Sequence, residues 1–120
     1  MTESLEDYLE MVSFLSDEGP VRVTDIAARL RVSKPSVLSA LKNLEEQRLL
    51  EHGRYQGVSL TGKGKQKAQE IRRRHRFLTD FLIQVIGVNP QTAERDACKM
   101  EHVLSPETLK KMQELAGKAE

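Results

Sequence analysis

The sequence has one cysteine and no tryptophan, and aromatic residues make up only 4% of its 120 residues. A single cysteine excludes an intramolecular disulfide and fits a reducing compartment. No segment approaches the roughly 18 apolar residues of a membrane-spanning helix, and the acidic N-terminus lacks a secretory signal pattern. We therefore expect a cytoplasmic protein whose thin core, at 38% hydrophobic residues, depends on a partner subunit.

The formal net charge is only +1, but the charges are unevenly distributed. Residues 1–18 carry six acids and no lysine or arginine, whereas residues 52–76 carry eight lysines and arginines and one acid. This asymmetry suggests cation binding in the first segment and phosphate binding in the second. Ordinary solvated helix faces are the alternative explanation, and charge alone does not decide between them.

The first segment, residues 4–18, has the apolar spacing of an amphipathic helix that ends at Gly19-Pro20. Asp7 and Glu10 lie three positions apart beside the apolar stripe, so their carboxylates point the same way. Such a pair is usually a solvated helix face. Only further donors elsewhere in the chain would make these two residues candidate metal ligands.

Residues 21–51 have the pattern of a helix-turn-helix. Thr24 is predicted to cap a short helix over residues 25–30, and Ser33 to cap a second one with Pro35 in its first turn. The predicted buried stripe of the second helix is Val37, Leu38, Leu41 and Leu44. The candidate DNA-binding residues are Ser33, Lys34, Pro35, Ser36, Ser39 and Lys42. A plain helical hairpin is the alternative at this point.

A predicted hairpin follows at once, with strands over residues 49–52 and 58–61 and a turn between them. A helix-turn-helix followed by a small basic hairpin is the element order of a winged helix. Arg54 at the predicted tip is positioned to reach phosphate or the minor groove, and it completes the candidate DNA-binding set.

The second half of the sequence is predicted to be helical throughout. Residues 63–86 form a long helix, basic in its first half and apolar in its second, that ends at Gly87. Such a change of character predicts a link between a DNA-facing domain and a packed, dimerising one. His75 lies at the change-over, and a lone histidine there is more often a surface or capping residue than a ligand.

A further helix is predicted from the Asn89-Pro90 cap to about Leu104, followed by a last helix over residues 106–116. Within the first of these, a thiol, a carboxylate and an imidazole occupy positions i, i+3 and i+4, which share one helix face. Each is a transition-metal ligand in its deprotonated form. These residues are Cys98, Glu101 and His102. A structural role for Cys98 as a small buried hydrophobe is the alternative.

Together, the winged helix, the apolar run that follows Arg-Arg-His-Arg at residues 73–76, and the segment 97–105 resemble one family. This is the family of metal-dependent repressors related to the diphtheria-toxin repressor and the manganese-transport regulators. The resemblance implies a mainly α homodimer, with a winged helix-turn-helix and its β-hairpin wing in residues 1–62 and a helical metal-binding and dimerisation domain in residues 63–120. It also implies a divalent metal co-repressor between these domains and double-stranded operator DNA as partner.

The ligands implied by the resemblance are a hybrid of two branches of that family. They are Asp7, Glu10, His75, Cys98, Glu101 and His102. Asp7 and Glu10 match the manganese branch, whereas Cys98 matches the iron branch, which has methionine where Asp7 stands. A second ligand set of the iron branch would fall here on Thr79 and Glu94, so that set is incomplete, and the SH3-like third domain of that branch is not expected.

Hard carboxylate ligands suit Mn²⁺ or Fe²⁺, whereas the soft Cys98 thiolate favours Fe²⁺, Zn²⁺ or Co²⁺. We therefore predict Mn²⁺ as co-repressor, with Fe²⁺ as the alternative and Zn²⁺ or Co²⁺ as substitutes in vitro. Six ligands exceed the needs of one tetrahedral site, so two metals per subunit also fit the pattern.

Two rival functions remain at this stage. One is a winged-helix regulator that responds to a signal other than metal. The other is an enzyme with Cys98 as nucleophile and His102 as base, which lacks a third orienting group and an oxyanion loop. We therefore predict a DNA-binding repressor and not an enzyme.

Overall fold

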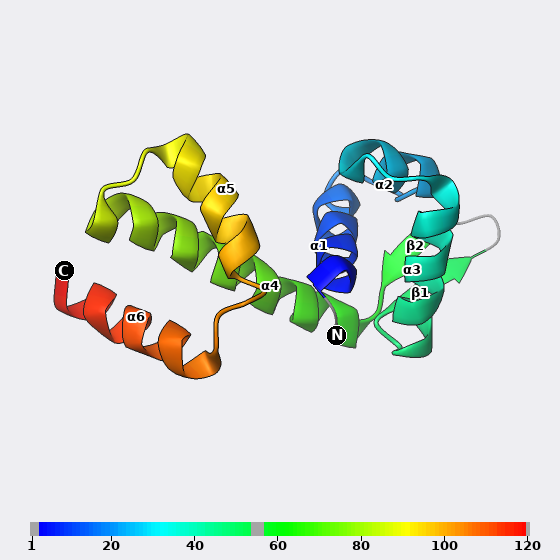
Figure 1. Ribbon diagram of the computed structural model, residues 1–120. Helices are drawn as coiled ribbons and strands as arrows, with labels where there is room; N and C mark the ends of the chain where they lie inside the picture. Colours follow the sequence, from blue (N-terminus) through cyan, green and yellow to red (C-terminus); the bar gives the residue numbers. More distant parts are fainter. Residues whose placement is uncertain (1–2, 54–56, 120) are drawn as a thin grey trace. The chain divides into compact units, whose positions relative to one another are not determined.

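The computed structural model describes residues 3–53 and 57–119, and the chain divides into two compact units, residues 1–70 and 71–120. The elements in order are α1 (Glu3–Ser16), α2 (Val23–Leu30), α3 (Lys34–Glu46), β1 (Leu50–Gly53), β2 (Gly57–Leu60), α4 (Gly62–Phe81), the π-helical turn η1 (Leu82–Ile86), α5 (Pro90–Met100) and α6 (Pro106–Ala119) (Figure 1). This order confirms the predicted winged helix-turn-helix followed by helices. Among the described residues, no helix is both long and apolar enough to cross a membrane.

The first unit is a three-helix core closed by the hairpin (Figure 1). Helix α1 packs against α2, α3 and β2, and α3 also packs against β1. The apolar spacing along each helix produces this arrangement, because residues three or four apart share a face. The side chains at the centre of this core are Leu9, Val12, Val21, Ile26, Val37, Leu41, Leu44, Leu50 and Val58.

Of the two helix caps predicted in the helix-turn-helix, one is confirmed and one is wrong. Ser33 caps α3 by accepting a hydrogen bond from the Ser36 backbone N–H at 3.2 Å, as predicted. The prediction that Thr24 caps α2 is wrong, because the helix already begins at Val23 and Arg22 occupies the cap position without a side-chain hydrogen bond. A bridge between Val21 and Val58 holds the chain just before α2, so long-range pairing determines where this helix starts.

The wing is a two-stranded antiparallel hairpin in which Leu50 faces Leu60 and Gly53 faces Gly57. Its strands lie within one residue of the predicted ranges. Gly57 has a φ of +76°, and a Cβ atom there would lie 2.5 Å from the Val21 carbonyl oxygen. Glycine is therefore required at this point of the wing. The predicted tip residue Arg54 lies outside the described residues.

Helix α4 starts against the wing through a second close approach. Thr61 caps the helix by accepting a hydrogen bond from the Gly64 N–H at 3.0 Å, and its hydroxyl donates to the Arg48 carbonyl at 2.7 Å. A Cβ atom on Gly64 would lie only 1.8 Å from the Leu49 carbonyl oxygen. This second glycine of the Gly-Lys-Gly-Lys stretch therefore allows the helix to pack directly on backbone.

The second unit consists of the later part of α4, the turn η1, and helices α5 and α6. Helix α5 folds back along the end of α4 and contacts η1 (Figure 1). The long helix was predicted to stay α-helical to residue 86, but its last five residues form a π-helical turn that ends at Gly87, with φ +86°. Asn89 caps α5 through the Gln91 N–H at 2.9 Å, as predicted. The buried side chains here include Ile71, Leu78, Phe81, Ala93 and Ala97.

Candidate metal centre and DNA-binding surface

Four of the six predicted ligands lie in the second unit: His75 is on α4, and the other three are at the end of α5 and in the turn after it. Cys98 is on α5, but this helix ends at Met100 and not near Leu104 as predicted. Glu101 is therefore the C-cap residue, whose N–H still bonds the Ala97 carbonyl at 3.0 Å, and His102 lies in the following turn. The prediction that all three share one face of one helix is wrong, because only Cys98 lies within α5. The donor atoms of Cys98 nevertheless lie near those of Glu101, and those of Glu101 near those of His102.

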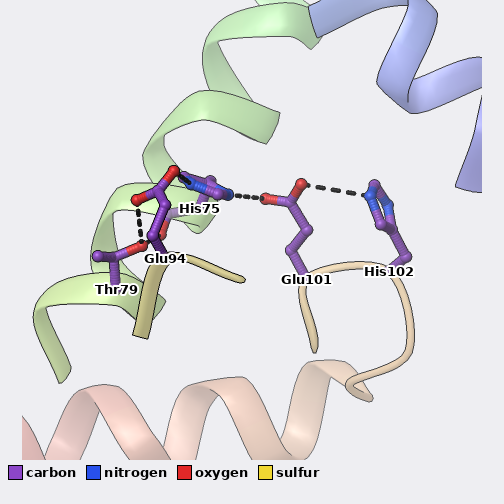
Figure 2. A network of polar contacts seen from close by, with 5 residues as sticks. All are labelled: His75, Thr79, Glu94, Glu101 and His102. Atoms are coloured by element: carbon purple, nitrogen blue, oxygen red, sulfur yellow. Dashed lines mark hydrogen bonds and ion pairs between the residues drawn. The ribbon is translucent and has the colours of Figure 1, made fainter. Parts of the chain in front are cut away.

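Glu101 is the centre of the cluster (Figure 2). Its side chain has no exposed surface, and its two carboxylate oxygens face two different imidazoles. One oxygen lies 3.3 Å from Nδ1 of His75 on α4, and the other lies 3.2 Å from Nε2 of His102. The Cys98 Sγ completes a group in which the donor atoms of His75, Cys98 and Glu101 all lie within 4.8 Å of one another.

Several polar atoms of this cluster are buried without a hydrogen bond of good geometry to a described residue. Nδ1 of His75 and both oxygens of Glu101 are buried, yet within the described part of the chain none of them makes a hydrogen bond of acceptable geometry. Buried polar atoms are nearly always paired, so such atoms call for a partner. A nitrogen, an oxygen and a sulfur donor converging at this distance could hold a divalent transition metal.

His75 has a second carboxylate partner, Glu94, which stands at a position that the family resemblance assigned to the incomplete second ligand set. Its Nε2 lies 2.7 Å from Oε1 of Glu94 on α5, and the other oxygen of Glu94 lies 3.5 Å from the Thr79 hydroxyl (Figure 2). Contact with Glu101 is the largest cause, and contact with Glu94 a further one, that raises the pKa of His75 to about 9, against the opposing effect of burial. One signal was available in the sequence, because Glu94 and Cys98 are four residues apart and share a helix face.

The other two predicted ligands, Asp7 and Glu10, belong to the first unit. They lie three residues apart on α1, where Glu10 is buried and Asp7 is half-buried.

The residues predicted to contact DNA are on the solvent side of α3. The six described ones are all exposed: Ser33, Lys34, Pro35, Ser36, Ser39 and Lys42. Leu38 was predicted to be buried but is 48% exposed, and the core position is taken by Ala40. The reason is helical spacing, since Leu38 is four residues from both Lys34 and Lys42 and shares their face. Leu38 is therefore a candidate DNA contact that sequence reasoning missed.

A winged helix-turn-helix followed by a helical unit with a histidine, thiol and carboxylate cluster defines the class of metal-responsive transcriptional regulators. Comparison with known families agrees. Residues 1–58 match the model "Iron dependent repressor, N-terminal DNA binding domain", and residues 61–120 match "Iron dependent repressor, metal binding and dimerisation domain". The chain belongs to this iron-dependent repressor family, whose members are DNA-binding regulators and not enzymes.

Individual relatives support the assignment. The chain is 47% identical over 108 residues to the transcriptional regulator MntR of Escherichia coli. The matched region covers 89% of this chain and 69% of the relative. Among solved structures, the manganese regulator SloR has a TM-score of 0.82 at 27% identity, and ScaR with bound Zn²⁺ has 0.82 at 26%. These matches cover 98% and 94% of this chain, which spans only 55% and 53% of the length of SloR and ScaR.

Proposed function

We propose that this chain is a homodimeric repressor that binds double-stranded operator DNA in the cytoplasm with Mn²⁺ as co-repressor and Fe²⁺ as the alternative. Residues 1–62 would form the DNA-binding domain, and residues 63–120 the metal-binding and dimerisation domain. The observation that carries the proposal is the buried Glu101 carboxylate. It faces two imidazoles, yet neither of its oxygens accepts a hydrogen bond of good geometry from a described residue.

The proposed ligands come from both units. His75, Cys98, Glu101 and His102 would hold the metal from the second unit, and Asp7 and Glu10 would complete the set from α1. When bound, a divalent metal would supply positive charge to the carboxylates and would be coordinated by these six side chains.

Coupling between the ligands and the DNA-binding surface is proposed to follow from charge. Without a cation, the carboxylates of Asp7, Glu10 and Glu101 would repel each other if brought together. Neutralising them would favour one placement of α1, and therefore of the recognition helix α3. In a dimer, two α3 helices must match successive major grooves about 34 Å apart. A coupling of roughly 1–3 kcal/mol would raise DNA affinity about 5–150-fold.

The candidate DNA-binding residues in and around α3 differ in the part of the DNA that their chemistry suits. Lys34 and Lys42 would contact phosphates, which supply most of the salt-dependent affinity. Ser36 and Ser39 would reach base edges in the major groove, and Ser33 and Pro35 would set the approach of the first helical turn. Arg54 would contact phosphate or the minor groove from the wing.

The choice of metal rests on the donor set and on the relatives. Five of the six donors are carboxylates or imidazoles that suit Mn²⁺, and SloR is a manganese regulator. The Cys98 thiol is softer and favours Fe²⁺ or Zn²⁺, and the crystal structure of ScaR contains Zn²⁺. We therefore expect Zn²⁺ and Co²⁺ to substitute in vitro.

The test is a metal titration read as DNA binding. A random DNA pool is first enriched on the Mn²⁺-loaded protein, and the affinity for the selected duplex is then measured by fluorescence anisotropy with and without Mn²⁺, Fe²⁺, Zn²⁺ and Co²⁺. Glu101→Gln should abolish the response to metal while the fold, followed by circular dichroism, is kept. Asp96→Asn, an equal loss of charge at an exposed position of α5, is the control. An affinity that does not depend on metal in the wild type would refute the proposal.

A further inference from the structure

Glu94 is the one carboxylate of the second-unit network that is not in the proposed ligand set. Its Oε1 accepts from His75 at Nε2, at 2.7 Å, which is the length of a charge-assisted hydrogen bond. The opposite ring nitrogen, Nδ1, is the one that faces Glu101. The two nitrogens of His75 therefore have different partners, one on each side of the ring (Figure 2).

We propose that Glu94 is a positioning residue for the metal centre: it keeps the proton of the His75 ring on Nε2 and fixes the ring so that Nδ1 is the ligand atom. This inference rests on the proposed function. A neutral imidazole has one protonated and one free nitrogen, and the free nitrogen binds the metal. A carboxylate that accepts the Nε2 proton selects the tautomer with a free Nδ1.

The surrounding helices hold Glu94 in place for this role. Glu94 and Cys98 are four residues apart on α5, so one helix presents both the thiol donor and the carboxylate that orients the histidine. Thr79 on α4 is four residues after His75, and its hydroxyl donates to the His75 carbonyl at 2.9 Å. The same hydroxyl oxygen lies 3.5 Å from the second oxygen of Glu94, so the carboxylate lies beside both His75 and Thr79 of α4.

The engagement of Nε2 also limits what His75 can do. With Glu94 on that side, His75 offers one free nitrogen. The size of the effect is moderated by solvent, because the side chain of Glu94 is 62% exposed. Loss of an orienting partner of a metal-bound histidine typically lowers metal affinity 10–100-fold, and here we expect the lower end of that range.

The test compares three variants of the full chain. Glu94→Ala and Glu94→Gln remove the same charge, but only the glutamine keeps an oxygen that can accept from Nε2–H. Asp96→Ala removes an exposed charge from the same helix and serves as the control. Mn²⁺ affinity is measured from the electron paramagnetic resonance signal of the free ion, which disappears on binding. Long-range ¹⁵N–¹H spectra of the Zn²⁺-loaded chain report which ring nitrogen of His75 is protonated.

We expect Glu94→Ala to lower Mn²⁺ affinity about tenfold, Glu94→Gln to lower it less, and Asp96→Ala to leave it unchanged. In the wild type the His75 Nε2 should be protonated and its proton protected from exchange, and this protection should be lost in Glu94→Ala. Equal affinities of the alanine and glutamine variants, or an unchanged Nε2–H signal in Glu94→Ala, would overturn the inference. Failure of the proposed function is a different result, because the wild type itself would then leave the free Mn²⁺ signal undiminished.

Discussion

Metal binding to this chain should strengthen steeply between pH 7 and pH 9, because His75 must give up a proton to become a ligand. Its pKa is raised from 6.5 to about 9, chiefly by contact with Glu101 and further by Glu94. At pH 7 only roughly one metal-free molecule in a hundred would have a neutral His75. The competing proton then weakens metal binding by about 100-fold, or about 2.7 kcal/mol, relative to an already neutral ring.

The measurement is Mn²⁺ affinity as a function of pH under argon, with calorimetry in buffers of different ionisation enthalpy. Affinity should rise about tenfold per pH unit from this histidine and level off near pH 9, with about one proton released per metal at pH 7. Cys98 also loses its proton on ligation, so the Cys98→Ala variant isolates the histidine contribution. If that variant released no proton, or if its affinity stayed flat between pH 7 and pH 9, the reasoning would be refuted.

The stability of the metal-free protein should fall over the same pH range in which metal affinity rises. A group whose pKa is raised in the folded state stabilises the fold fully below its unfolded pKa and loses this contribution as pH rises through the folded value. For His75 that window runs from 6.5 to about 9. Because its side chain is 17% exposed, we expect a loss of about 2–3 kcal/mol in the free energy of unfolding, measured by urea denaturation. A His75→Gln variant should lack this dependence.

Two further predictions concern packing and DNA recognition in the first unit. Gly64→Ala should destabilise the chain by about 2 kcal/mol or more, because its Cβ would lie 1.8 Å from the Leu49 carbonyl oxygen. Gly62→Ala is the control: its Cβ would meet nothing within 4 Å, so it should be neutral or stabilising. Urea denaturation of both variants measures the difference. Leu38→Ala should weaken binding to selected DNA while leaving stability nearly unchanged, because this side chain is exposed. Leu41→Ala, at a buried position, should instead cost about 2–5 kcal/mol of stability. A Leu38 variant with full DNA affinity would place this residue outside the interface.

The parts of the fold that sequence predicted well are those determined by neighbouring residues. Ser33 and Asn89 each cap a helix through a backbone N–H two or three residues further on, so their role can be read from local chemistry. The order of helix, turn, helix and hairpin follows from apolar spacing in the same way. The start of α2 could not be predicted in this way, because the bridge between Val21 and Val58 joins segments 37 positions apart.

In the candidate site, too, contacts between near neighbours in the sequence were predicted better than contacts between distant residues. The spacing of Cys98, Glu101 and His102 predicted that their donors would approach, and the approach of His75 was expected only through a family resemblance. The contact between His75 and Glu94 joins residues 19 positions apart on two different helices, so no local pattern contains it. Whether Asp7 and Glu10 complete the ligand set stays a prediction that metal titration of their alanine variants can test.

The contacts of His75 also change how the metal-free centre is understood. The proposed coupling rests only on repulsion among the carboxylates of Asp7, Glu10 and Glu101 when no cation is bound. In the second unit, however, Glu101 and Glu94 flank one imidazole whose pKa of about 9 keeps it protonated at neutral pH. The imidazolium therefore neutralises part of this negative charge when no metal is bound. Metal binding at this centre would then exchange one cation for another, so the local charge would rise by less than the full charge of the incoming ion.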